Sequence, residues 1–219
     1  MFSGFENEII DFFWAIRFNN NRPWFNEHKK IYVEKIYEPM KDLAREVCTG
    51  MEEAYHLESM WKCSRIYRDA RRPHRDGPYR DHLWFVLAEQ NRWSAVPTFY
   101  AEISAEGISY GFGSYCAPSA YMKNVREKMQ ANPAEIERLI SDFEKDGSYR
   151  VNGDSYKRPK GHLSERIDPW YNRKNIGFAA FEEWNEENMG AELPQYLVRR
   201  FEKLVPLYRW FWQCVPLEE

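Results

Sequence analysis

The sequence predicts a single α+β domain spanning residues 1–219, in which a mostly antiparallel sheet packs against N-terminal and C-terminal helices. Helical spacing of apolar residues dominates both ends of the chain, apolar–polar alternation dominates residues 65–114, and no stretch has the composition of a linker. Hydrophobic residues make up 43% of the 219 residues and aromatic residues 17%, which is enough for one sizeable core.

The N-terminal part of the chain predicts three helical stretches. Apolar residues recur at helical spacing over residues 5–18, namely Ile9, Phe12, Phe13 and Ile16. Asn21 is expected to cap the next helix, with Pro23 in the first turn, where the missing N–H removes no hydrogen bond. Pro39 is expected to break or kink this helix before a third helical stretch continues.

Strands are predicted in the middle of the chain. Leu83 to Ala88 is a short apolar run, and apolar residues alternate with polar ones from Phe99 to Ile103 and from Ile108 to Phe112. Ala105-Glu106-Gly107 indicates a turn between the last two strands. The order strand, loop, strand, turn, strand indicates a mostly antiparallel sheet.

Helices return in the C-terminal half. One helical face is formed by Tyr121, Val125 and Met129. Asn132-Pro133 restarts a helix, and residues 147–162 are expected to form a strand and a loop. A final helix is expected from Leu193, with a kink at Pro206.

Composition and charge exclude several classes of protein. The net charge of −3 argues against a domain wrapped in nucleic acid, because such domains carry a basic excess. The N-terminus lacks the features of a secretory signal, and no apolar run is long enough to span a bilayer. The cysteines form no Cys-x-x-Cys pair, so we expect reduced thiols in a cytoplasmic protein, without a metal site or a cofactor.

The densest chemistry is a stretch of nineteen positions that holds six arginines: Arg65, Arg68, Arg71, Arg72, Arg75 and Arg80. Planar guanidinium groups suit phosphate and carboxylate recognition better than lysine does. Residues 64–70 are expected to form a strand. Its alternation would place Arg68 on one face and three residues on the other, namely Arg65, Asp69 and Arg71.

We therefore predict an arginine-rich pocket that binds an anionic small molecule carrying a phosphate group. Its site residues are Arg65, Arg68 and Arg71 as anion contacts, Asp69 as the group that orients one arginine, and Tyr79 at the rim. A charged hydrogen bond contributes about 1.5–3 kcal/mol, whereas a solvated surface salt bridge contributes about 0–1 kcal/mol. No nucleophile or general base stands out, so binding is expected ahead of catalysis and enzymatic activity stays an open question.

Two other functions fit the same stretch. A nucleic-acid-binding module would place the arginines on phosphates and stack tyrosine or tryptophan on bases, and its affinity would fall steeply with salt. A structural or interaction protein would use the arginines only in salt bridges with glutamates such as Glu182, Glu183, Glu186 and Glu187.

Several other residues favour structural roles. Asn19, Asn20 and Asn21, beside Trp24 and Phe25, would suit the binding of a ring or a sugar, but a capped helix start with packed aromatic residues is favoured. His74 and His82 show no spacing typical of a metal site or a catalytic group.

Charged neighbours give the remaining signals. Cys63 lies beside Lys62 and Arg65, which would lower the pKa of a thiol, but a small buried side chain is favoured. Carboxylates near the six arginines are expected to stay ionised, namely Asp69, Asp76 and Asp81. A lesser basic patch beside Tyr156 consists of Lys157, Arg158, Lys160 and His162.

Four segments form a recognisable set: Arg65-Ile-Tyr-Arg-Asp-Ala-Arg71 followed by Pro78-Tyr79, Phe18-Asn-Asn-Asn-Arg-Pro-Trp-Phe25, Tyr37-Glu-Pro-Met40, and Pro159-Lys-Gly161. The set resembles the signature of the bacterial "domain of unknown function 2461" family and extends over nearly the whole chain. The resemblance implies a bacterial cytosolic protein but no activity. The chain departs from the family at Arg72, where relatives carry Phe, and at Arg75-Asp76-Gly77, where they carry an acidic residue and a lysine.

Overall fold

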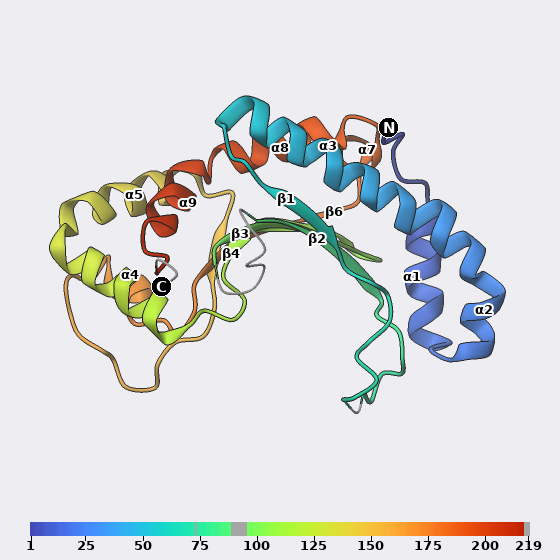
Figure 1. Ribbon diagram of the computed structural model, residues 1–219, viewed down its shortest axis with the longest axis horizontal. Coiled ribbons are helices and arrows are strands. Elements are labelled where there is room, and N and C mark those ends of the chain that lie inside the picture. Colours follow the sequence, from blue (N-terminus) through green and yellow to red (C-terminus); the bar gives the residue numbers. More distant parts are fainter. Residues whose placement is uncertain (73, 89–95, 217–219) are drawn as a thin grey trace. The chain divides into compact units, whose positions relative to one another are not determined.

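A six-stranded antiparallel sheet is present in the computed structural model, which describes residues 1–72, 74–88 and 96–216 (Figure 1). The strands lie in the order β1-β2-β3-β4-β6-β5. Their bounds are β1 Met60–Cys63, β2 His82–Ala88, β3 Thr98–Ser104, β4 Gly107–Gly113, β5 Arg150–Asn152 and β6 Gly177–Glu183. The predicted α+β class and the predicted antiparallel sheet are confirmed.

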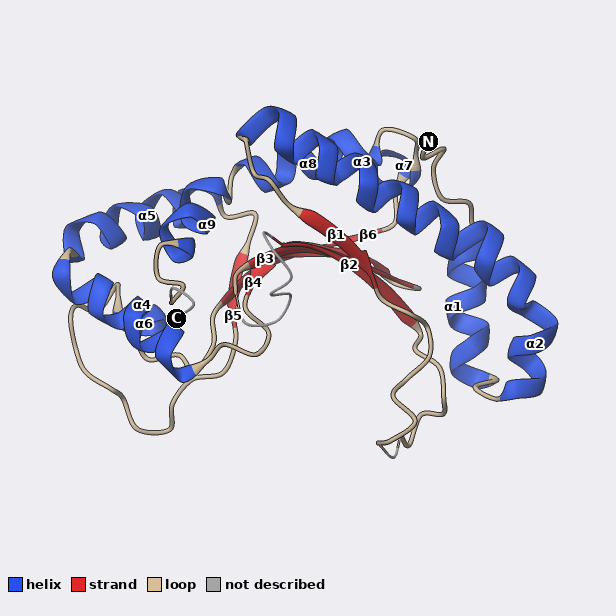
Figure 2. Ribbon diagram, in the orientation of Figure 1, coloured by secondary structure: helices blue, strands red, loops and turns tan. Residues whose placement is uncertain are grey.

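Helices precede, interrupt and follow the strands along the chain (Figure 2). The N-terminal ones are α1 Glu8–Phe18, α2 Arg22–Ile31, the π-helical segment η1 Tyr32–Tyr37 and α3 Glu38–Tyr55. The later ones are α4 Ser119–Ala131, α5 Pro133–Asp146, α6 Asp168–Tyr171, α7 Glu186–Met189, α8 Leu193–Glu202 and α9 Val205–Trp212. Within the described residues, none of these helices has the length and apolar character needed to cross a membrane.

The chain divides into two compact units, which are described separately. The first comprises Met1–Leu87, Tyr100–Tyr110 and Phe181–Arg199. The second comprises Ala88–Phe99, Gly111–Ala180 and Arg200–Glu219. Four strands, β2, β3, β4 and β6, contribute residues to both units, β2 only through its last residue, Ala88.

In the first unit, one face of the strands is buried and the other is half-buried. Along β2 the buried side chains Leu83, Phe85 and Leu87 alternate with half-buried ones, as the strand period of two requires. Helix α3 lies against β1 (Figure 1). The apolar face predicted for the first helix is buried throughout, at Ile9, Phe12, Phe13 and Ile16.

The core of the second unit is built from aromatic rings. The ring centroids of Phe112 on β4 and Phe178 on β6 are 4.9 Å apart, and Phe178 lies 5.6 Å from Phe211 on α9. Trp170 on α6 completes this cluster, 4.8 Å from Phe178. Such pairs add about 0.5–1.5 kcal/mol each beyond the apolar area that they bury, so the cluster anchors the short helix α6 to the strands.

Proline positions differ from the expected breaks. The chain stays helical from Arg22 to Tyr55, and the π-helical turn of η1 lies immediately before Pro39. Pro39 lies one residue after the π-helical segment, so the helix is locally distorted next to the proline but continues through it instead of breaking. Pro206 lies in the first turn of the separate helix α9, where its missing N–H removes no hydrogen bond, so a single kinked helix from Leu193 is the wrong description.

The strand expected at residues 64–70 is also wrong. Within this segment only Tyr67 pairs as a strand residue, in an isolated bridge with Tyr79. The extended path ends at Asp69 because its carboxylate accepts a hydrogen bond from the backbone N–H of Arg71, 3.1 Å away. A short side chain that bonds to the backbone two residues later favours a turn over a continued strand.

Candidate anion-binding site

The arginine stretch forms a paired loop between β1 and β2 (Figure 2). Backbone hydrogen bonds flank the Tyr67–Tyr79 bridge on both sides. The N–H of Arg68 donates to the carbonyl of Pro78 at 2.8 Å, and the N–H of Arg80 donates to the carbonyl of Ile66 at 2.7 Å. The base of the loop is therefore a defined backbone frame from which arginine side chains project.

Buried residues from the N-terminal helices support this frame. Phe25 is fully buried, and its ring stacks on that of Tyr79 with centroids 4.2 Å apart. The side chain of Asn20 binds both backbone groups of Tyr79, with its Nδ2 donating to the carbonyl at 2.9 Å and its Oδ1 accepting from the N–H at 3.0 Å. Gly77 has a φ of +85°, and a Cβ there would lie 2.6 Å from Asn20, so only glycine fits.

Two arginines are fixed on this frame by backbone carbonyls. The Nε of Arg68 donates to the carbonyl of Tyr79 at 2.7 Å. The Nη1 of Arg80 donates to the carbonyls of Arg65 and Tyr67, and its guanidinium carbon lies 4.9 Å from the ring centroid of Trp84. These contacts hold both guanidinium groups in place without neutralising them.

The positive charge of this pair is uncompensated. Among the described residues, no carboxylate lies within 4 Å of Arg68 or Arg80. Burial, and next the neighbouring charge of Arg68, lower the pKa of Arg80 from its usual value. The two guanidinium groups therefore repel each other, and an anion between them would relieve this repulsion.

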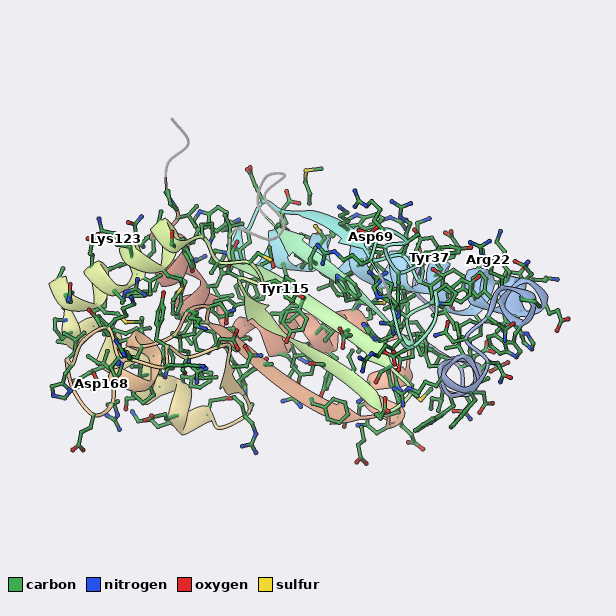
Figure 3. The ribbon with its side chains drawn as sticks, turned by 90° about the horizontal axis from the view of Figure 1, so that it is seen from below. Arg22, Tyr37, Asp69, Tyr115, Lys123 and Asp168 are labelled. Carbon is green, nitrogen blue, oxygen red and sulfur yellow. The ribbon has the colours of Figure 1, made fainter. Side chains whose placement is uncertain are left out.

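The other predicted site residues take different roles. Asp69 (labelled in Figure 3) does orient an arginine, but that arginine is Arg71, whose Nη2 lies 2.8 Å from the carboxylate and whose side chain is 88% exposed. The hydrogen bonds from Arg71 lower the pKa of Asp69, as expected for an ionised carboxylate. Arg65 is exposed. The prediction that Tyr79 lines a rim is wrong, because Tyr79 is only 3% exposed beneath the loop.

Next to the arginine pair, the half-buried face of β2 and β3 carries titratable groups, of which the sequence pointed to His82 and Asp81 but not to Glu102. The Nδ1 of His82 lies 3.1 Å from Asp81, and the His82 ring stacks on Trp84 at 5.7 Å. Burial raises the pKa of Glu102, on the neighbouring strand. Alternation around Ala101 and Ile103 already places Glu102 on this face, so its position was readable from the pattern.

Arg17 joins this face to α1. Its guanidinium binds Asp81 through Nε at 2.5 Å and also forms a two-point contact with Glu106. The hydrogen bond from Arg17 lowers the pKa of Glu106 to about 2. Although burial opposes ionisation of Asp81, hydrogen bonds from Arg17 and His82 hold its pKa below the usual value.

These pairs predict an acid-sensitive contribution to stability. Because the pKa of Glu106 in the folded protein is below its ordinary value of 4.5, the contribution is complete above pH 4.5 and is lost as the pH falls towards about 2. Replacing Arg17 with Ala should therefore lower the free energy of unfolding at pH 7 and have progressively less effect as the pH falls through this range. The loss at pH 7 should be about 1 kcal/mol, because water screens the partly exposed pair.

Urea denaturation from pH 7 down to the lowest pH at which both proteins stay folded measures this difference. Arg138→Ala is the control, since it removes an exposed arginine that has no carboxylate within 4 Å among the described residues. Equal pH profiles for wild type and Arg17→Ala would contradict the assignment.

The remaining sequence signals also have defined outcomes. Asn21 caps α2 by accepting a hydrogen bond from the N–H of Trp24 at 3.0 Å, which confirms the structural interpretation of that residue. Cys63 is half-buried, and burial raises the pKa of its thiol to about 12, opposite to the lowering that Lys62 and Arg65 would cause. The Nε2 of His74 lies 3.0 Å from the backbone carbonyl of Asp69. In the described part of the chain, no group of three or more His, Cys, Asp or Glu residues is arranged to hold a metal ion.

The chain matches a known protein family. The family model described as "Conserved hypothetical protein (DUF2461)" matches residues 8–210. No curated protein matches the chain. The match covers the arginine stretch and its supporting helices together, so both belong to the shared architecture.

Proposed function

We propose that this chain, which belongs to the DUF2461 family of conserved hypothetical proteins, binds an anionic small molecule and recognises it through a phosphate group held by Arg68 and Arg80. The proposal rests on one observation. Two neighbouring guanidinium groups are fixed by backbone carbonyls, and no carboxylate of the described residues lies within 4 Å of either. Arginines kept only for solubility need no such support.

The arrangement suits phosphate in particular. Each guanidinium uses one nitrogen on the backbone, which leaves further N–H groups that can point to oxygen atoms of a ligand. A phosphate group offers several acceptor oxygens, and charged hydrogen bonds to it contribute about 1.5–3 kcal/mol each. Arg65 lies beside the pair, and its exposed side chain is free to extend towards a bound ligand because its own carbonyl, not its guanidinium, holds Arg80.

The alternatives are less well supported. A protein that used these arginines only in salt bridges would pair Arg68 and Arg80 with carboxylates, as it pairs Arg71 with Asp69. A nucleic-acid module would need phosphate contacts along a strand, against a net charge of −3. The outcome of a salt titration separates this last alternative from small-molecule binding.

A cytoplasmic location is part of the proposal. All four cysteines are free thiols, and burial raises the pKa of Cys214 to about 11. Thiols that stay reduced are typical of cytosolic proteins.

The test measures binding of nucleotides and sugar phosphates by calorimetry. In the wild-type protein at least one of them should bind with a dissociation constant below about 1 mM, and Arg68→Ala should weaken that binding about tenfold or more, because one charged hydrogen bond of at least 1.4 kcal/mol is lost. Arg68→Lys should recover only part of the affinity, since lysine keeps the charge but not the planar fork.

Arg71→Ala is the matched control, because it removes an exposed arginine of the same loop that is already paired with Asp69. It should leave the affinity within about twofold. The proposal fails if the wild type binds none of these ligands. A single-stranded oligonucleotide whose affinity falls steeply with salt, with no small ligand bound, would instead support the nucleic-acid module.

A further inference from the structure

A second cluster of positive charge lies in the second unit, around the ring of Tyr156. Arg126 projects from α4, and its guanidinium carbon lies 5.7 Å from the ring centroid of Tyr156. The ammonium group of Lys160 lies 4.6 Å from the same centroid. Because both groups lie against the same ring, the distance between the Arg126 guanidinium carbon and the Lys160 ammonium nitrogen is no more than the sum of these two distances. In Figure 3, α4 is marked by Lys123 and α6 by Asp168.

The guanidinium of Arg126 is incompletely satisfied. Its Nη1 is buried and has no hydrogen-bond partner among the described residues, and none of their carboxylates lies within 4 Å of Arg126 or Lys160. A buried charged donor without an acceptor is strongly unfavourable, and such groups are rare in folded proteins. The contact with the Tyr156 ring offsets part of this cost but supplies no acceptor oxygen. An external anion would supply the acceptor that the described residues do not.

Asn172 holds the backbone around the cluster through its side chain and its carbonyl. The Oδ1 of Asn172 accepts a hydrogen bond from the N–H of Lys160 at 2.6 Å, and its Nδ2 donates to the carbonyl of Gly161 at 3.1 Å. The carbonyl of Asn172 accepts from the N–H of Tyr156 at 2.9 Å. The segment that carries Tyr156 and Lys160 is thus fixed next to α6 before any ligand arrives, which lowers the entropy lost on binding.

Some basic side chains near Tyr156 are paired with carboxylates and others are not. His162 is engaged with Asp168, with 2.6 Å between Nδ1 and Oδ2, and Lys123 is paired with Glu127 at 3.6 Å. Arg126 and Lys160 are the cations of this cluster with no such partner among the described residues. Lys157 and Arg158 of the same basic patch also have no carboxylate within 4 Å among the described residues, so the available charge is at least double and positive.

We propose that Arg126 and Lys160 form a second anion-binding site, with Tyr156 as its apolar wall, that takes a phosphate or diphosphate group. The guanidinium supplies directional N–H donors, and the ammonium supplies a mobile point charge that closes on the opposite oxygens. Every residue that forms this site belongs to the second unit, whereas Arg68 and Arg80 belong to the first.

The experiment is carried out in the Arg68→Ala protein, so that the first proposed site does not contribute. Inorganic pyrophosphate is titrated into this protein by calorimetry at low ionic strength. Binding should be detectable below about 10 mM, and adding Arg126→Gln should weaken it about tenfold or more. Adding Lys160→Gln should weaken it by a smaller factor, because the lysine is exposed and flexible.

Arg138→Gln is the matched control. It makes the same chemical change at an exposed arginine of α5, and it should leave the affinity within about twofold. Lys160→Gln also tests the proposal in a variant that should fold like its parent, since this side chain is at the surface. The proposal is overturned if pyrophosphate does not bind the Arg68→Ala protein, or if Arg126→Gln and Lys160→Gln both bind it as tightly as their parent. Either result leaves the Arg68 and Arg80 proposal unaffected, because that proposal is tested by Arg68→Ala against the wild type.

Discussion

Replacing Gly111 with Ala is expected to destabilise the folded protein more than any other change predicted here. Gly111 lies on β4, and a Cβ built there would lie 1.8 Å from the backbone carbonyl oxygen of Phe178 on β6. Contacts below 3 Å do not persist in folded proteins, and the atom in the way is backbone rather than a flexible side chain. The two strands would have to separate, which also opens the aromatic cluster around Phe178. We expect a loss of more than about 3 kcal/mol, the upper range for overpacking.

Urea denaturation followed by circular dichroism measures this loss. Gly147→Ala is the control, because Gly147 has a positive φ of +66° but the nearest atom to its Cβ is 3.9 Å away. The Gly147→Ala variant introduces backbone strain but no collision, so it should lose only about 1 kcal/mol of stability. Equal stability losses in the two variants would contradict the close approach of β4 and β6.

Phe25→Ala is expected to have the second largest effect, and it should lower the affinity for the proposed ligand as well as the stability of the fold. Phe25 is 0% exposed and packs on Tyr79, Tyr67 and Tyr32. Emptying such a position typically costs about 3–5 kcal/mol. Tyr79 would lose the ring beneath it, and its carbonyl is the group that fixes Arg68. Ligand affinity should therefore fall even at temperatures where the variant is folded.

Chemical denaturation and ligand titration at low temperature measure the two effects separately. Phe25→Leu keeps most of the apolar volume and should lose less in both measurements. Phe18→Ala, at a position 81% exposed, should change stability by less than about 0.5 kcal/mol. A Phe25→Ala protein that is destabilised but binds the ligand normally would show that Tyr79 does not position Arg68.

Local patterns predicted most of the secondary structure because the relevant physics is local. The capped start of α2 at Asn21, the restart of α5 at Asn132 and the alternating strands β3 and β4 follow from neighbours within a few residues. Two strands were missed for an equally physical reason. The four residues of β1 are too short to show alternation, and β6 begins with Gly177 and contains adjacent alanines, which have weak strand preference. Their pairing partners, far away in sequence, decide their conformation.

For the candidate site, too, local features were predictable and contacts between distant residues were not. The concentration of arginines and the role of Asp69 as an arginine partner were readable from composition. The choice of which arginines stay unpaired was not, because it depends on contacts across the fold. Arg80 is selected by carbonyls on the opposite side of the loop, and Tyr79 is buried by Phe25. Neither contact can be predicted from the spacing of neighbouring residues.

Asn20 also determines how the arginine loop opens. Its side chain forms the two backbone hydrogen bonds with Tyr79 that a neighbouring strand would otherwise form, and the two residues are 59 positions apart in sequence. The loop therefore owes its order to the turn between α1 and α2 as well as to its own hydrogen bonds, and we expect the two segments to open together. In amide hydrogen exchange, protection of the Tyr79 N–H should follow the opening of that turn, so the two segments behave as one cooperative unit whose exchange rate reports how often the arginines leave their positions.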